Sequence, residues 1–235
     1  MLSFSILGFP VRVHWMFWVV AGLLSGALSM QGPELFVTLF TWIPVVFVSI
    51  LWHELGHAQA QKKYGGRPEI LLYGMGGLAS ASVRVTRRQS MWISAAGPAA
   101  SISLYLATLL VAIVMGMQVR YGWTGAFVID AKEVDGVLRP TVTMRIFNSL
   151  LWVNGFWTLI NLLPILPLDG GRIFEAFMAP RNPRIVPTVG MVVAGLVAVA
   201  GFLFFGSLFM AILFGFMAYE NWKRRNGTYS GSGMF

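Results

Sequence analysis

The sequence predicts an all-α polytopic membrane protein with about six transmembrane helices and a short β-hairpin that dips into the membrane. Of the 235 residues, 57% are hydrophobic and only 11% are charged, whereas a soluble domain carries about 25% charged residues. The apolar residues form long runs, and about 20 consecutive apolar residues are enough for a helix to cross a bilayer. These observations together predict a multi-pass protein surrounded by lipid, and the cell membrane is its expected location.

The apolar runs give the order of the expected spans along the chain. They cover approximately residues 11–30, 35–61, 91–117, 146–163, 187–204 and 207–222. Residues 1–10 are expected to form an interfacial lead-in. The last two spans share one apolar stretch of roughly 33 residues, which as a single helix would measure about 50 Å against a hydrocarbon core of about 30 Å. Two shorter helices that meet near residues 206–207 are therefore predicted.

The segment between the second and third spans is too short and too rich in glycine to be a span itself. Residues 70–73 and 81–85 are predicted to be strands around a turn that includes Gly74, Gly76 and Gly77. Such a hairpin is tolerated at membrane depth only where protein or cavity water shields its backbone. Its open edge is also able to pair with an extended peptide.

The basic residues predict how the chain is oriented. Loop 62–88 holds six Lys and Arg residues against Glu69 alone, so the positive-inside rule places this loop in the cytoplasm. Six spans then bring both termini, and the cluster at residues 223–225, to the same side. The net charge of +8 is concentrated at the ends of apolar runs, which is typical of membrane-flanking loops, so no nucleic-acid partner is expected.

One motif, His53-Glu54-Leu55-Gly56-His57, lies near the end of the second span. Residues four apart share a face of a helix, so His53 and His57 can direct their imidazoles to one point and supply half of a tetrahedral zinc site. Glu54 is then placed to take a proton from a metal-bound water. The alternative is a buried His–Glu–His cluster without a cation, which would cost several kcal/mol in hydrocarbon.

A third ligand is predicted from the topology. The chain has no cysteine, so its metal ligands must come from His, Asp, Glu or Asn. His57 precedes Lys62 by five residues, about 8 Å along a helix, and Asp169 is expected on an irregular piece at the cytoplasmic end of the fourth span. His57 and Asp169 are therefore expected at the same depth in the membrane. His53, His57 and Asp169 would leave a fourth metal position open for water or substrate, as in catalytic zinc sites.

These residues resemble the site-2 protease family of intramembrane zinc metalloproteases. The resemblance rests on H-E-x-x-H at residues 53–57 and on N-x-x-P-x-x-P-x-D-G at residues 161–170, with a third motif of small residues at Gly97-Pro98 and Ser101. It implies that His53, His57 and Asp169 bind one zinc ion per chain and that Glu54 is the catalytic acid and base. It also implies that Asn161 contacts the substrate or the developing oxyanion, and that Gly74–Ser82 forms the hairpin near the substrate.

The expected function is hydrolysis of a peptide bond in or near the transmembrane segment of a membrane protein substrate, as in regulated intramembrane proteolysis. A single domain is expected over residues 1–222, with its catalytic core at about 35–180 and a polar tail at 223–235, in a minimal form without a PDZ or CBS domain. The active site is expected to open to the cytoplasm. A membrane metal-ion transporter and an inactive relative that only binds membrane segments are the alternatives, and the sequence leaves the oligomeric state open.

Overall fold

The computed structural model describes residues 1–26, 30–74, 76–80, 84–122, 125–129, 131–134 and 137–227. The chain divides into two compact units. Unit 1 comprises Met1–Val83 and Ala96–Thr158, and unit 2 comprises Arg84–Ala95 and Leu159–Phe235. The expectation of a single domain over residues 1–222 stays a prediction.

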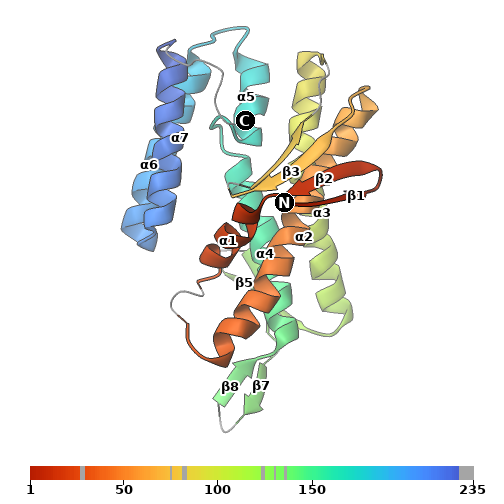
Figure 1. Ribbon diagram of the computed structural model, residues 1–235. Coiled ribbons are helices and arrows are strands. Elements are labelled where there is room, and N and C mark those ends of the chain that lie inside the picture. The colour runs from red at the N-terminus through yellow and green to blue at the C-terminus, as the bar shows by residue number, and fades with distance from the viewer. Residues whose placement is uncertain are drawn as a thin grey trace. The chain divides into compact units, whose positions relative to one another are not determined.

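Unit 1 is built around a four-stranded sheet of order β1-β2-β3-β4 (Figure 1). The strands are β1 (Leu2–Ile6), β2 (Phe9–Val13), β3 (Glu69–Tyr73) and β4 (Gly76–Ser80). The central pair β2–β3 is parallel, and the two outer pairs are antiparallel. Burial alternates along β2 and β3, so that their apolar side chains share one face of the sheet.

The sheet corrects the prediction for the N-terminal region. Residues 1–10, expected to be an interfacial lead-in, contain β1 and the start of β2. The expected span at residues 11–30 begins in a strand and continues as the helix α1 (Trp15–Leu24) of only 10 residues. Ten residues give a helix of about 15 Å, half the hydrocarbon thickness. Residues 27–29 lie outside the described part of the chain.

Helix α2 (Pro33–Lys63) is the longest element of unit 1 among the described residues. It starts with a proline at its first position, where the missing N–H costs no hydrogen bond. Its buried apolar residues form one core with those of the sheet and α1. Asn154 in the next helix but one, α4 (Val142–Asn161), donates to Ser49 Oγ at 2.9 Å, which is the interhelical bond that a buried polar group needs in an apolar bundle.

The glycine-rich hairpin exists, but its second strand lies earlier than predicted. Strand β4 occupies residues 76–80, whereas residues 81–85 were the expected position. Residues 75 and 81–83 lie outside the described residues. The pairing of Tyr73 with Gly76 places the turn directly after Tyr73, where Gly74 lies. The fold is therefore mostly helical but contains a larger sheet than a single hairpin.

Helix α3 (Arg87–Val114) corresponds to the expected third span. The connection that follows it contains two further pairs of antiparallel strands. These are β5 (Gln118–Gly122) with β6 (Gly125–Ile129), and β7 (Ala131–Val134) with β8 (Val137–Pro140). Asn148 of α4 holds β6 by accepting from the N–H of Val128 at 2.7 Å and donating to its carbonyl at 3.1 Å.

Unit 2 contains α5 (Asp169–Met178) and a helical hairpin, α6 (Ile185–Phe205) and α7 (Leu208–Arg225), whose helices lie side by side (Figure 1). Gly206 turns the chain with φ of 60°, a left-handed conformation that favours glycine. Ser207 then caps α7 by accepting from the N–H of Met210 at 3.2 Å. This pair agrees with the predicted helices that meet at residues 206–207.

Three of the described helices are long and apolar enough to cross a membrane: Pro33–Lys63, Arg87–Val114 and Ile185–Phe204. Helices α4 and α7 occupy the expected fourth and sixth spans with 20 and 18 residues, but they are not among these three. The expected total of six spans is therefore not confirmed.

Candidate metal centre

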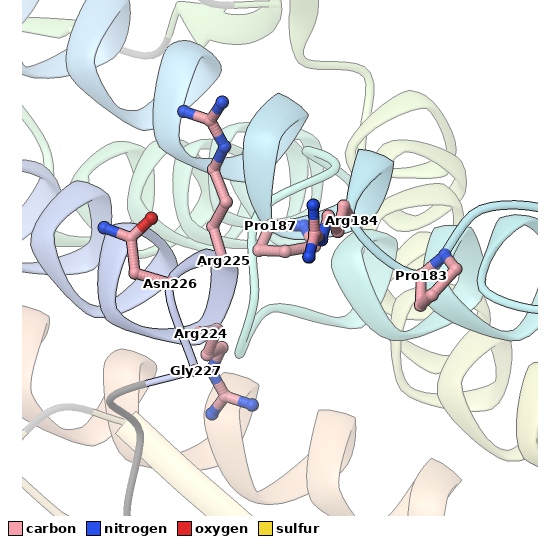
Figure 2. A pocket seen from close by; sticks show the side chains of 7 residues that line it. All are labelled: Pro183, Arg184, Pro187, Arg224, Arg225, Asn226 and Gly227. Carbon is pink, nitrogen blue, oxygen red and sulfur yellow. The ribbon is translucent and has the colours of Figure 1, made fainter.

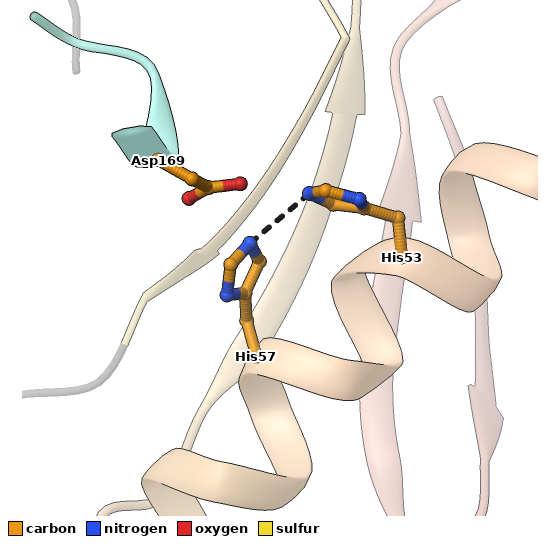
Figure 3. A group of neighbouring side chains, drawn as sticks. All are labelled: His53, His57 and Asp169. Carbon is orange, nitrogen blue, oxygen red and sulfur yellow. Dashed lines mark hydrogen bonds between the residues drawn. The ribbon is translucent and has the colours of Figure 1, made fainter. Parts of the chain in front are cut away.

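The H-E-x-x-H motif lies on α2, with all three of its polar side chains buried. His53 and Glu54 are 5% exposed and His57 is 8% exposed. The two imidazole rings stand nearly perpendicular, and their Nε2 atoms lie 3.1 Å apart (Figure 3). Helical spacing thus directs both rings to one point, as the sequence predicts.

The spacing of the two ring nitrogens fits a zinc ion. Two ligand nitrogens of a tetrahedral zinc site are about 3.3 Å apart, since each Zn–N bond is about 2.0–2.1 Å. The observed 3.1 Å between the Nε2 atoms of His53 and His57 needs only a small change to reach this value. The pair therefore matches half of a tetrahedral site, and neutral imidazole is a ligand that zinc prefers.

Ser101 of α3 contacts His53 at Nδ1, the ring nitrogen that does not face His57. Its Oγ lies 3.0 Å from Nδ1 of His53, and the serine is only 4% exposed. An imidazole that donates from Nδ1 keeps the lone pair of Nε2 for a metal, and such a partner also fixes the orientation of the ring. The hydroxyl is able to accept from Nδ1, and this arrangement would leave Nε2 of His53 available for a metal.

Two glycines let α2 and α3 approach closely at this point. A Cβ added to Gly56 would overlap with the carbonyl oxygen of Ala96, and a Cβ added to Gly97 would overlap with the Nε2 atoms of both histidines. Gly97 therefore borders the position that a metal ion would take. The sequence analysis identifies Gly97 and Ser101 as part of a motif of small residues, but not as neighbours of the histidines. Their separation of four residues, equal to that of the histidines, is the signal that places both on one face.

The hairpin formed by β3 and β4 lies against the H-E-x-x-H motif at Glu54. A Cβ added to Gly77 of β4 would overlap with the side chain of Glu54, so a larger residue at this position would displace the carboxylate. Gln61, two turns further along α2, donates from Nε2 to the carbonyl of Ala79 at 2.7 Å. Of the three glycines predicted to form the hairpin, Gly76 and Gly77 belong to β4, and Gly74 lies in the turn.

Strand β4 is the edge of its sheet. Its pairing with β3 extends from the pair of Tyr73 and Gly76 to the pair of Glu69 and Ser80. Among the described residues, no other strand pairs with the second side of β4. The edge that is available for pairing is thus carried by the strand whose Gly77 contacts Glu54. An extended segment added at this edge would gain main-chain hydrogen bonds beside the carboxylate.

In unit 2, Asp169 is the half-buried first residue of α5 (Figure 3), rather than part of an irregular piece as the sequence predicts. The chain turns sharply before this helix. A Cβ on Gly170 would overlap with the carbonyl of Leu162, and one on Gly171 would overlap with the backbone of Ile165. Glycine at both positions is therefore required for the preceding loop to fold back against the start of α5.

Two side chains hold the loop that precedes Asp169. The buried Asn221 of α7 donates from Nδ2 to the carbonyl of Leu166 at 2.7 Å. The exposed Arg172 donates from Nε to the carbonyl of Pro167 at 3.2 Å. The sequence analysis identified neither Asn221 nor Arg172 as a residue that holds this loop. Asn161 is the last residue of α4 and is partly buried.

The model of peptidase family M50 matches residues 41–213 of the chain. The protein belongs to peptidase family M50. This membership confirms the resemblance to site-2 proteases that the two motifs predict. The matched region contains the H-E-x-x-H motif of α2 and the D-G-G sequence at the start of α5.

Known proteins that are named zinc metalloproteases are similar to this chain. A zinc metalloprotease of Methanocaldococcus jannaschii is 28% identical over 206 residues, which cover 85% of this chain and 53% of that protein. Rip3 of Mycobacterium tuberculosis is 28% identical over 188 residues, which cover 75% of this chain and 43% of that protein. The chain thus spans about half the length of the curated relatives that it matches.

A solved structure shares the fold. The site-2 protease from Methanocaldococcus jannaschii matches with a TM-score of 0.59 and 23% identity, and the match covers 100% of both chains. The M50 member described here therefore has the site-2 protease fold.

Proposed function

We propose that this M50 protein is an intramembrane zinc metalloendopeptidase that hydrolyses a peptide bond in or near the transmembrane segment of a membrane protein. The observation that carries the proposal is the buried pair of imidazoles, with Nε2 atoms 3.1 Å apart, directly beside Glu54 on an apolar helix. Relatives named zinc metalloproteases support the metal and the reaction. Regulated proteolysis of a membrane-anchored regulator is the process that this reaction would serve.

The proposed ligands are His53, His57 and Asp169, which hold one zinc ion per chain. Each of the three offers one ligand atom of a type that zinc binds. When bound, zinc lowers the pKa of water toward 7 and polarises a carbonyl group. Asn161 is proposed to donate a hydrogen bond to the carbonyl oxygen as negative charge develops on it. The support for Asp169 and Asn161 is their position in the second family motif.

Glu54 is the proposed acid and base. A carboxylate next to the first ligand is able to accept a proton from the attacking water and deliver it to the nitrogen of the leaving amine. Its burial at 5% exposure excludes bulk water from this proton transfer. The contact with Gly77 restricts where the carboxylate can move.

The substrate is proposed to bind as an extended strand at the open edge of β4. The carbonyls of a transmembrane helix are occupied by intrahelical hydrogen bonds, so the segment must unwind before its peptide bond can react. Pairing with β4 would replace some of the lost bonds and would bring the unwound segment to Glu54. The three apolar helices support a lipid environment, and a multi-pass arrangement with both termini and the active-site opening in the cytoplasm is proposed from the charged loops.

The proposed function is tested by replacing Glu54 with Gln. The purified protein is reconstituted in vesicles with a single-span reporter protein, and release of the reporter's soluble fragment is measured. Loss of the general base should lower cleavage by at least about a hundredfold. Glu175→Gln, at an exposed position on α5, is the matched control and should cleave like the original protein. Undiminished cleavage by the Glu54→Gln variant would show that the assigned chemistry is wrong.

A further inference from the structure

A cavity of about 600 Å³ opens at the end of the helical hairpin of unit 2 (Figure 2). It lies where α6 begins and α7 ends, and it plays no part in the proposed hydrolysis. Its lining residues come from both helix ends: Pro183, Arg184, Pro187, Arg224, Arg225, Asn226 and Gly227. The volume falls within the range of about 300–1,000 Å³ that is common for small-molecule sites.

The cavity is strongly cationic. Three of its seven lining residues are arginines, and none of the seven is acidic. Glu220, an acidic residue one turn before Arg224 on α7, is already paired with Lys223 at 2.8 Å. Arginine guanidinium groups offer several N–H donors in a planar fork, which matches the oxygens of a phosphate group. The lining therefore favours a phosphate-bearing anion over a neutral or cationic ligand.

Proline residues shape the backbone around these arginines. Pro183 precedes α6, and Pro187 lies in its first turn. The fixed φ of proline restricts the backbone on both sides of Arg184. On the opposite wall, Arg224 and Arg225 end α7. The backbone positions of the three arginines are thus set by two helix ends that belong to one hairpin.

The exposed side chains of the α6–α7 hairpin are those expected of a surface in contact with lipid, with the cavity near the headgroups. Large apolar side chains are exposed along both helices, among them Leu196 and Phe202 on α6 and Ile212 and Phe216 on α7. At the end of α7 the exposed rings of Tyr219 and Trp222 stack with their centroids 5.9 Å apart. Tyr and Trp gather at the boundary between hydrocarbon and water. Arg224 and Arg225 follow Trp222 within one helical turn, about 5 Å along the axis.

We propose that this arginine pocket binds the phosphate group of an anionic phospholipid. Basic pockets between membrane helices are known to bind such headgroups. The anionic leaflet also keeps the lipid at a high local concentration beside the protein. A free phosphate ion offers the same chemistry without the acyl chains. Binding of either kind would be separate from the metal motif, so the inference holds whether or not the proposed peptidase reaction is correct.

The test measures lipid binding to the full chain in detergent by native mass spectrometry. Dioctanoyl phosphatidylglycerol is the anionic probe, dioctanoyl phosphatidylcholine is the zwitterionic comparison, and inorganic phosphate is the free anion. The original protein should bind phosphatidylglycerol at least tenfold more tightly than phosphatidylcholine. Arg184→Gln combined with Arg225→Gln should weaken phosphatidylglycerol binding by at least tenfold. Both side chains are exposed, so these changes should leave the fold intact.

A charge-matched control distinguishes binding in the arginine pocket from attraction by the overall positive charge of the surface. Arg181→Gln combined with Arg88→Gln removes the same charge from exposed positions outside the cavity, and it should retain tight binding. Arg184→Lys with Arg225→Lys should retain more binding than the glutamine pair. If inorganic phosphate displaces the lipid only at a far higher concentration than that of the lipid, the lipid headgroup is the ligand. If it displaces the lipid at equal concentration, the assignment to lipid is overturned. Equal losses in the pocket and control variants would overturn the pocket altogether.

Discussion

At the residue scale, the candidate metal centre depends on Gly97, a residue that has no side chain. Gly97 faces the Nε2 atoms of His53 and His57, and any Cβ there would overlap with both rings. The two helices are also held close by Gly56, whose own Cβ would overlap with the backbone of α3. Ser101 contacts Nδ1 of His53, so displacement of this ring would break that contact. Space for a metal therefore depends on this one glycine.

Gly97→Ala should consequently lower the zinc content of the purified protein by at least tenfold. The added methyl group displaces the imidazoles from the geometry that a tetrahedral ion requires. Zinc is measured by inductively coupled plasma mass spectrometry after purification in detergent. Gly195→Ala on α6, where a Cβ would meet nothing within 4 Å, should keep the zinc content of the original protein.

A second glycine supplies the contrast. Gly77→Ala places its methyl group against the carboxylate of Glu54 rather than against the ligands. This variant should keep its zinc and lose most of its cleavage of the reporter. If the Gly97→Ala variant retains full zinc, or if the Gly77→Ala variant loses its zinc, the separate assignments of these two glycines are wrong.

The sequence predicts the centre of this site better than its surroundings. His53, Glu54 and His57 are close in sequence, so the helical repeat alone places two rings on one face. Gly97 and Ser101 reach the same point only because α3 packs on α2, which is a long-range contact that no local pattern specifies. Small residues in a membrane helix indicate close packing without naming what lies across the contact.

At the element scale, the loop before Asp169 depends on a hydrogen bond from a distant helix. Asn221 of α7 is fully buried and donates to the carbonyl of Leu166. Gly190 of α6 leaves room for it, because a Cβ there would overlap with the amide group of Asn221. The hairpin α6–α7 thus has a structural role in holding the loop, in addition to its apolar surface.

Asn221→Ala should lower the free energy of unfolding by about 1–3 kcal/mol, because a buried carbonyl loses its donor. Arg172→Gln, which removes an exposed hydrogen bond to the neighbouring carbonyl of Pro167, should cost less than about 0.5 kcal/mol. Thermal unfolding in the same detergent compares the two. An Asn221→Ala variant as stable as the Arg172→Gln variant would contradict this role for the amide.

The elements that the sequence mispredicts are those whose pattern is ambiguous without tertiary contacts. Val11 and Val13 are apolar because they face the core from a strand, yet apolar residues that continue into α1 resemble the start of a span. The parallel pairing of β2 with β3 joins residues that are far apart in the chain, and it cannot be seen in local periodicity. Helices α2, α3, α6 and α7 were predictable because their apolar runs are long.

At the scale of the whole molecule, the two family motifs belong to different units. His53, Glu54 and His57 lie in unit 1, whereas Asn161 and Asp169 lie in unit 2. Family membership over residues 41–213 includes both motifs. One zinc ion held jointly by His53, His57 and Asp169 is the proposal that makes them a single catalytic centre. It predicts that metal binding stabilises both units together.

The most direct measurement is the zinc content per chain of the original protein, Asp169→Ala and Glu175→Ala, purified in parallel. The second variant removes an exposed carboxylate from the same helix, α5. About one zinc per chain is expected in the original protein and in Glu175→Ala, and at least tenfold less is expected in Asp169→Ala, since loss of one of three protein ligands opens the site. A full complement of zinc in the Asp169→Ala protein would contradict the shared metal centre.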